Sequence, residues 1–284
     1  MNRPTRTTRP ETFRDRARRI VPGLSRLFPA GRVAIIRVNG PIGGSGRTLE
    51  LIELAKRLRE SPRVPAVVLD IDSPGGSATA SDELFIAFER LAAAKPLVAS
   101  IRGTGASGAY LAAMAAQRVL TNPNAIVGSI GVIAAGPRLP RLLDRLGVSV
   151  SETRAGRLKG MGAPWREETD EERAKEQSVV DAIYEAFVGR VAKGRGMTME
   201  RVRELATGEV WLGTEAVALG LVDEIGDLER AVEVAASIAG VPATSAPVRI
   251  RRPLMGRLIE RFSVRLASGV ADEIETRLAD RYRL

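Results

Sequence analysis

Two residue types on which many hydrolases depend are missing from this sequence. The chain of 284 residues contains no histidine and no cysteine. A Ser-His-Asp triad, a cysteine nucleophile, a disulfide framework and a Cys/His zinc site are excluded, because no residue could fill those roles. Arginines make up 38 of the 43 basic residues, and an arginine side chain stays protonated. A catalytic base must therefore be Asp, Glu, Tyr, a cofactor or one of five lysines.

A serine lies in a glycine-rich turn between a predicted strand and a predicted helix. The turn GTGASG at 103–108 follows the apolar run 97–101 and precedes an alanine-rich segment at 109–117. A serine at such a junction is exposed, and the N–H groups of the following helix can bind an oxyanion. The strand end DSPGG at 72–76 is expected beside it, where glycines let a substrate carbonyl approach an N–H closely. Ser107 is the candidate nucleophile.

The same turn matches the G-x-G-x-x-G pattern of dinucleotide-binding folds. That fingerprint requires an acidic residue about 20 residues further on, and no Asp or Glu lies between Glu89 and Asp144. It also usually follows the first strand of its unit, whereas this turn follows the third predicted strand. Two interpretations remain open at this point: a nucleophile turn, or a tight connection without chemistry.

Lysine can replace histidine as the base for a serine nucleophile. Lys159 is in the apolar, glycine-rich loop 158–165, directly after a predicted strand at 148–153. We expect it to be buried near a sheet end, beside Met161 and Trp165. The other lysines are in polar positions or away from the expected carboxyl ends of the strands: Lys56, Lys95, Lys175 and Lys193. Lys159 is therefore the candidate base.

The elements predicted to position these residues alternate between short apolar strands and amphipathic helices. Such alternation indicates a parallel sheet with helices on its faces. A helix with Ser81 as its N-cap follows the second strand, and a long helix with an apolar stripe starts near Thr169. Strands are predicted at 33–38, 66–71, 97–101, 118–121, 126–133 and 148–153, and helices at 49–58, 82–94, 109–117, 139–146, 198–206, 213–219 and 227–238.

Most of the net charge of +9 is near the two ends of the chain. Residues 1–32 carry +7 and residues 245–284 carry +4. No window of about 20 apolar residues predicts a transmembrane helix, and arginines interrupt every candidate signal-peptide core. We expect a basic amphipathic arm at 1–31, a linker and basic amphipathic helix at 241–284, and a cytoplasmic or membrane-peripheral location. The arms are expected either to contact an anionic membrane surface or to be solvated tails. Nucleic acid is the less favoured partner.

Several ordered motifs extend the pattern beyond the serine and the lysine. They are DSPGG at 72–76, GASGAY at 105–110, GSIGV at 128–132, Lys159 with PWRE at 164–167, and GEVW at 208–211 with LGLVD at 219–223. Over residues 32–240 the sequence resembles the signal peptide peptidase A family, Ser-Lys proteases of the Clp protease/crotonase superfamily. The resemblance implies an α/β fold with a parallel sheet flanked by helices, and leaves the helical C-terminal extension outside the match.

The resemblance also implies roles for individual residues. Ser107 would be the nucleophile and Lys159 the general base, with Ser129 as the hydroxyl that orients the lysine. Backbone N–H groups of Gly76 and Gly108 would form the oxyanion hole. The walls of the substrate groove would include Ser77, Ile130, Gly131 and Val132. Members of this family assemble into rings or domes in which one site can combine the serine and lysine of neighbouring subunits, so a homo-oligomer is expected.

The function that follows is a serine endopeptidase without metal or cofactor. It would cleave extended hydrophobic peptides, such as signal-peptide remnants, through an acyl-enzyme. One alternative is a crotonase-type acyl-CoA enzyme, which has a similar fold and oxyanion hole but typically depends on carboxylates. A second alternative is a non-catalytic scaffold whose basic arms bind a membrane or nucleic acid.

Overall fold

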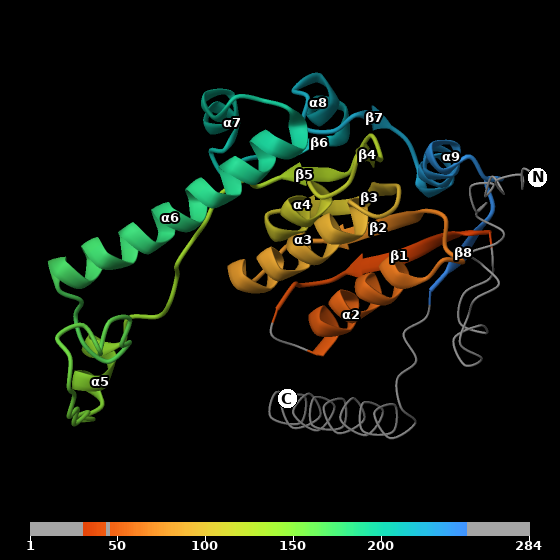
Figure 1. The fold of residues 1–284 in the computed structure, drawn as a ribbon. Coiled ribbons are helices and arrows are strands. Elements are labelled where there is room, and N and C mark those ends of the chain that lie inside the picture. Colours follow the sequence, from red (N-terminus) through yellow and green to blue (C-terminus); the bar gives the residue numbers. More distant parts are fainter. Residues whose placement is uncertain (1–30, 44–45, 249–284) are drawn as a thin grey trace, which may run out of the picture. The chain divides into compact units, whose positions relative to one another are not determined.

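An eight-stranded sheet lies at the centre of the part of the chain that the structure describes (Figure 1). This computed structural model describes residues 31–43 and 46–248, which belong to one compact unit ending at Val248. The predicted basic arm, apart from Gly31, and the predicted basic helix lie outside the described residues. The strands are β1 Val33–Asn39, β2 Val67–Ser73, β3 Leu97–Ala106, β4 Arg118–Thr121, β5 Ile126–Gly128, β6 Val210–Leu212, β7 Glu224–Ile225 and β8 Ser245–Pro247.

The strands follow the order β6-β5-β3-β2-β1-β8, and β4 pairs with both β3 and β7. All of these pairs are parallel except β5 with β6. The predicted parallel α/β fold is confirmed. The carboxyl ends of β2, β3 and β5 meet at one edge of the sheet, where Ser73 pairs with Gly105 and Ala106 pairs with Gly128. The turns that follow these three strands therefore lie together.

Both faces of the central strands are covered. Val33, Ile35 and Val68 pack with helix α9 (Leu228–Ala239) on one face. Their neighbours of opposite orientation, such as Ile36 and Leu69, are also fully buried. Since successive side chains of a strand point to opposite faces, strands buried on both sides read as continuous apolar runs. The helices are α2 Gly46–Glu60, α3 Ala78–Ala92, α4 Gly108–Ala113, α5 Pro140–Arg145, α6 Asp170–Arg195, α7 Met199–Leu205, α8 Gly213–Ala218 and α9 Leu228–Ala239.

Two predicted strands differ from the structure. Residues 148–153 form no strand, because this segment has left the sheet and has no neighbouring strand to pair with among the described residues. The strand predicted at 126–133 ends at Gly128, since Ser129 has a φ of 51°. That left-handed conformation cannot continue a strand.

Two further predictions are corrected at the ends of elements. Helix α3 is capped by Ser77, whose side chain accepts a hydrogen bond from the Ala80 N–H, and not by Ser81, which is buried in its first turns. The helix begins earlier because it follows directly on the glycine turn. The segment at 241–247 is not only a linker: residues Ser245–Pro247 form β8, a parallel edge strand beside β1. Proline is tolerated there because an edge strand need not donate on both sides.

Helix α6 begins outside the sheet region and ends against it. Its start near Thr169 is confirmed by a capping box. The Glu172 N–H donates to the Thr169 hydroxyl, and the Thr169 N–H donates to the Glu172 carboxylate. At the other end Phe187 is buried and Arg195 pairs with Asp223 at 3.1 Å. We call residues 134–183 the extension.

No helix in the described ranges is long and apolar enough to cross a membrane.

Candidate active site

Ser107 occupies a strained position between β3 and α4. Its φ of 52° and ψ of −125° are rare for a residue with a side chain, and such strain is found most often at functional sites. The conformation is held by the hydrogen bond from the Ser107 N–H to the Gly128 carbonyl, 2.8 Å long. The hydroxyl makes no capping bond to α4, and the residue is half-buried. Its oxygen is thus available to a substrate.

Ser129 has the same unusual backbone as Ser107. Its φ is 51°, and its N–H donates to the Glu209 carbonyl at 2.6 Å. Because Gly128 pairs with Ala106 across β5 and β3, the two strained serines follow directly on paired residues of neighbouring strands. The structure therefore brings Ser107 and Ser129, whose role was implied by the resemblance, to the same edge of the sheet.

Two glycine N–H groups lie beside Ser107. A Cβ on Gly75 would be 2.6 Å from the Gly108 nitrogen and 2.9 Å from the Ser107 Cβ. A Cβ on Gly108 would be 3.6 Å from the Gly76 nitrogen. Only glycine fits such a close approach of two backbones. Within the described ranges neither Gly76 nor Gly108 donates its N–H to a protein acceptor. Two free donors next to a free hydroxyl can stabilise a tetrahedral oxyanion.

A groove of about 1,060 Å³ passes over these groups. Ser107, Ser129, Gly76 and Gly108 line it, and so do three of the four predicted wall residues: Ser77, Gly131 and Val132. The fourth, Ile130, does not. Its side chain is completely buried, because the left-handed backbone at Ser129 turns the chain so that the next residue faces the core. Ile130 cannot present its side chain to a substrate in the groove.

The opposite wall of the groove comes from α6. Ile183, Phe187 and Arg190 line it, although the sequence pattern placed the first two only in an apolar stripe of a long helix. Arg190 pairs with Asp82 of α3 at 2.5 Å and lies over the Phe85 ring, 4.3 Å from its centroid. This contact fixes α6 against α3. Apolar residues of α6 that pack in the core and those that line the groove belong to the same apolar stripe. The sequence alone therefore does not distinguish the two roles.

Lys159 does not meet Ser107 in this chain. The side chain is exposed, contrary to the predicted burial, and Lys159 does not line the groove. Met161 and Trp165, the expected sources of burial, are each 38% exposed. The prediction failed because residues 148–153 are not a strand of the sheet, so the loop after them belongs to the extension. The nearest apolar layer of the sheet is therefore not available to cover the lysine.

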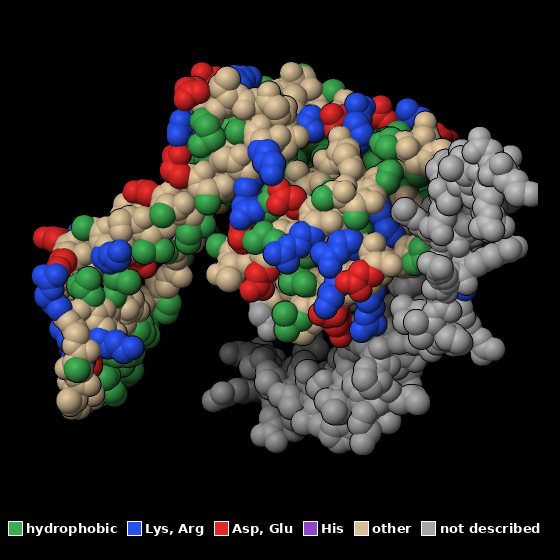
Figure 2. All heavy atoms as spheres, viewed as in Figure 1, with side chains coloured by type: hydrophobic (Ala, Val, Ile, Leu, Met, Phe, Trp, Pro, Cys, Tyr) green, Lys and Arg blue, Asp and Glu red, His purple; other side chains and the backbone are tan. Residues whose placement is uncertain are grey.

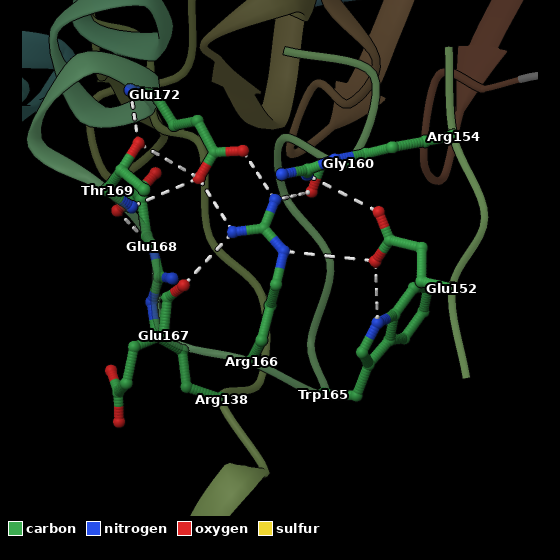
Figure 3. A network of polar contacts seen from close by, with 10 residues as sticks. All are labelled: Arg138, Glu152, Arg154, Gly160, Trp165, Arg166, Glu167, Glu168, Thr169 and Glu172. Carbon is green, nitrogen blue, oxygen red and sulfur yellow. Dashed lines mark hydrogen bonds and ion pairs between the residues drawn. The ribbon is translucent and has the colours of Figure 1, made fainter. Parts of the chain in front are cut away.

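Charged side chains hold the extension together (Figure 3). Arg166 bonds both oxygens of Glu172, at 2.8 and 2.5 Å, and the Gly160 carbonyl at 2.7 Å. The Arg166 guanidinium lowers the pKa of Glu172 to about 2, and Glu172 in turn raises the pKa of Arg166. The Trp165 indole N–H donates to Glu152 at 3.1 Å. Acidic residues of the described part form no group of three that could hold a metal ion.

Comparisons with known proteins identify relatives over most of the chain. The family model described as peptidase family S49 matches residues 89–242. A putative protease of Synechocystis sp. is 36% identical over 230 residues, which are 80% of this chain and 82% of that protein. The chloroplastic serine protease SPPA of Arabidopsis thaliana is 35% identical over 74% of this chain but only 32% of its own length. A putative signal peptide peptidase SppA of Enterococcus faecium is 32% identical over 71% of this chain and 62% of its own length.

Proposed function

We propose a Ser-Lys mechanism for this chain, which belongs to peptidase family S49 and is a serine peptidase. Ser107 attacks the scissile carbonyl and forms an acyl-enzyme. Lys159 takes the serine proton, returns it to the leaving amine, and then activates the water that releases the acyl group. The acyl-CoA and non-catalytic alternatives are set aside, because membership of a peptidase family accounts for the serine turn directly.

The developing negative charge is stabilised by the N–H groups of Gly76 and Gly108. The observation that carries this assignment is the strained turn at Ser107, with two donors that no protein acceptor uses within the described ranges. Preorganised donors of this kind act only when the tetrahedral oxygen forms, so they favour the transition state over the bound peptide. Ser129, on the neighbouring strand end, would accept or donate a hydrogen bond that orients the lysine amine.

The lysine comes from a second copy of the chain. A base must come within about 3 Å of the proton that it removes, yet Lys159 is exposed on the extension, outside the groove that holds Ser107. At about 1.5 Å per residue, Glu172, whose partner Arg166 holds the lysine turn, is about 22 Å along α6 from Phe187 in the groove wall. A site assembled between copies in a homo-oligomer reconciles these positions.

The exposed surface of the extension supports such an assembly. Eight of the fifteen large apolar side chains exposed in the described residues lie within 134–183, and Figure 2 shows apolar side chains along the part formed by α5 and the first half of α6. Exposed apolar patches mark sites of association. The eight are Leu142, Leu146, Val148, Val150, Met161, Trp165, Val179 and Ile183.

The substrate we propose is an extended, hydrophobic peptide such as a signal-peptide remnant. Apolar side chains on both walls, among them Leu111, Val132 and Phe187, make a groove suited to apolar residues of a peptide. The basic arms outside the described residues would bring the enzyme to an anionic membrane, where such remnants arise. The cytoplasmic or membrane-peripheral location stays a prediction, as does the contact of the arms with lipid.

The test is labelling and hydrolysis by the full chain. A fluorophosphonate should label the wild type, and both labelling and hydrolysis of an apolar fluorogenic peptide should disappear in Ser107→Ala and in Lys159→Ala. Lys175→Ala removes a lysine that is exposed on α6 and should keep full activity. Labelling that persists in Ser107→Ala, or hydrolysis that persists in Lys159→Ala, would contradict the dyad.

A further inference from the structure

We propose that Arg166 positions the lysine-bearing turn, so that peptide hydrolysis depends on a residue that touches neither the substrate nor Ser107. This inference rests on the proposed role of Lys159 as the base. Figure 3 shows the arrangement: the guanidinium of Arg166 lies between the carboxylates of Glu152 and Glu172 and points at the Gly160 carbonyl. Arg166 would be a positioning residue, not a catalytic one.

Among the described residues, the backbone N–H groups of the turn that carries Lys159 make only local bonds, and its Arg157 pairs with Glu171 of α6 at 2.6 Å through side chains that are largely exposed. The Lys159 N–H donates to the Gly156 carbonyl at 3.1 Å, and the Met161 N–H to the Leu158 carbonyl at 3.0 Å. These bonds shape the turn but do not fix it to the rest of the chain. Neither a strand ladder nor a helix includes residue 159. Its position therefore depends on contacts made by neighbouring side chains.

Arg166 supplies that connection to α6. One guanidinium nitrogen donates both to the Gly160 carbonyl, at 2.7 Å, and to Glu172, at 2.5 Å, while the other donates to Glu172 at 2.8 Å and to the Glu167 carbonyl at 3.1 Å. The Glu172 side chain is 3% exposed and is itself fixed by the capping box with Thr169. A bidentate pair fixes orientation as well as distance. The peptide next to Lys159 is thus joined to the first turn of α6.

Glu152 encloses the same peptide from the other side. Its carboxylate lies 3.9 Å from the Arg166 Nε and accepts the Trp165 indole N–H. A Cβ on Gly160 would be 2.6 Å from a Glu152 oxygen and 2.8 Å from Arg166 Nη2. A Cβ at 160 would have to displace the ends of these side chains, so the charged groups pack closely against the peptide of the turn. The charged groups enclose the backbone of the turn and leave the Lys159 side chain exposed.

Loss of this connection should affect the chemical step more than substrate binding. Apart from residues 182 and 183 at the end of the extension, the groove residues belong to other segments, and Arg166 is not among them. Misplacement of a catalytic group by about 1 Å can reduce the rate about 100-fold. A displaced base lowers kcat, whereas KM, which reflects the groove, should change little. A residue needed only for folding would instead lower the amount of folded enzyme. The kcat of the molecules that remain folded would then stay at the wild-type value.

The experiment compares Arg166→Met and Arg166→Lys with a matched control in the full chain. The concentration of folded chain is determined by circular dichroism, and kcat and KM are measured per folded chain. We expect kcat to fall at least 10-fold in Arg166→Met with KM within threefold, and to recover partly in Arg166→Lys, whose single amine cannot bond Gly160 and both Glu172 oxygens. Arg173→Met removes an arginine of the same extension that pairs with Glu168 and Asp170, and should keep wild-type kcat.

Two results would overturn the inference. The first is a kcat within threefold of wild type for Arg166→Met. The second is an equal loss of kcat in Arg173→Met, which would indicate a general effect of charge in the extension. If Arg166→Met does not fold, Arg166→Lys decides in the same way, with wild-type kcat as the contrary result. Failure of the dyad itself is recognised separately, because Lys159→Ala would then hydrolyse peptide whatever the Arg166 variants do.

Discussion

A methyl group added to Gly108 would test the oxyanion hole at the atom level. In Gly108→Ala the new Cβ would lie 1.9 Å from the Ser81 Oγ and 2.7 Å from the Ser81 Cβ, but 3.6 Å from the Gly76 nitrogen. Distances below 3 Å cannot be tolerated, and Ser81 is 1% exposed within α3. The strained turn before α4 is the part that moves. The Gly108 N–H would then leave the position at which it meets the oxyanion.

The expected loss is large and confined to the chemical step. Removal of one oxyanion donor costs about 100-fold to 1,000-fold in kcat, and KM should change little because the added methyl points toward Ser81 and none of the apolar side chains of the groove walls is removed. Removal of the clashing atoms should reverse the loss in steps. Ser81→Ala in the Gly108→Ala background leaves the 2.7 Å contact and should recover part of kcat, whereas Ser81→Gly removes both contacts and should recover most of it.

The control and the contrary outcome are equally defined. Ser81→Gly alone should keep kcat, because the Ser81 hydroxyl has no hydrogen-bond partner in the described part of the chain, and should lower stability by up to about 1 kcal/mol through helix propensity. The assay is peptide hydrolysis per folded chain, with the folded fraction measured by circular dichroism. Wild-type kcat in Gly108→Ala, or no recovery in the Ser81→Gly/Gly108→Ala double variant, would refute the assignment of this N–H.

Two further predictions concern stability. Burial lowers the pKa of Lys95 to about 8, and its amine donates to the Ser61 and Val64 carbonyls. In the unfolded chain the amine keeps its proton up to about pH 10.5. Because the unfolded chain binds more protons between pH 8 and 10.5, the Lys95 contribution to the free energy of unfolding should rise over this range. Urea unfolding of the wild type against Lys95→Met should show this rise as a difference between the two, and parallel pH profiles would contradict it. Gly189→Ala should stabilise α6 by up to about 1 kcal/mol and leave hydrolysis unchanged. The added Cβ has room, because the nearest atom to it is the Met199 sulfur at 3.9 Å. A lower urea midpoint for this variant would show that the site has less room than these contacts indicate.

The strand ends that carry the serines could be predicted from the sequence because each signal is local. Buried runs terminated by glycine motifs gave β2 and β3 and placed Ser107 at a strand-to-helix junction. The role of Ser129 was implied only by the family resemblance, and its place near Ser107 follows from the register of β3 with β5. The long helix α6 could be predicted from its apolar stripe, and the capping box at Thr169 confirms where it starts.

The environment of Lys159 could not be predicted in the same way. Residues 148–153 are β-branched and polar in alternation, which is typical of a strand, but strand formation requires a partner strand, and the described part of the chain offers none there. The Arg166 network also joins residues whose side chains meet only after the extension has folded. Ile130 shows the same limit on a smaller scale, since a single positive φ at Ser129 decides which side chain enters the groove.

The most direct test of the account is to mix two inactive variants. Ser107→Ala chains keep the lysine and Lys159→Ala chains keep the serine, so co-assembly after dissociation can rebuild a dyad only if the two residues come from different copies. With equal amounts and random assembly, about one quarter of the sites combine both groups, and hydrolysis should return to about a quarter of the wild-type rate. A mixture of Lys159→Ala with the double variant should stay inactive. Persistent inactivity of the first mixture, with co-assembly shown by crosslinking, would contradict a dyad shared between copies.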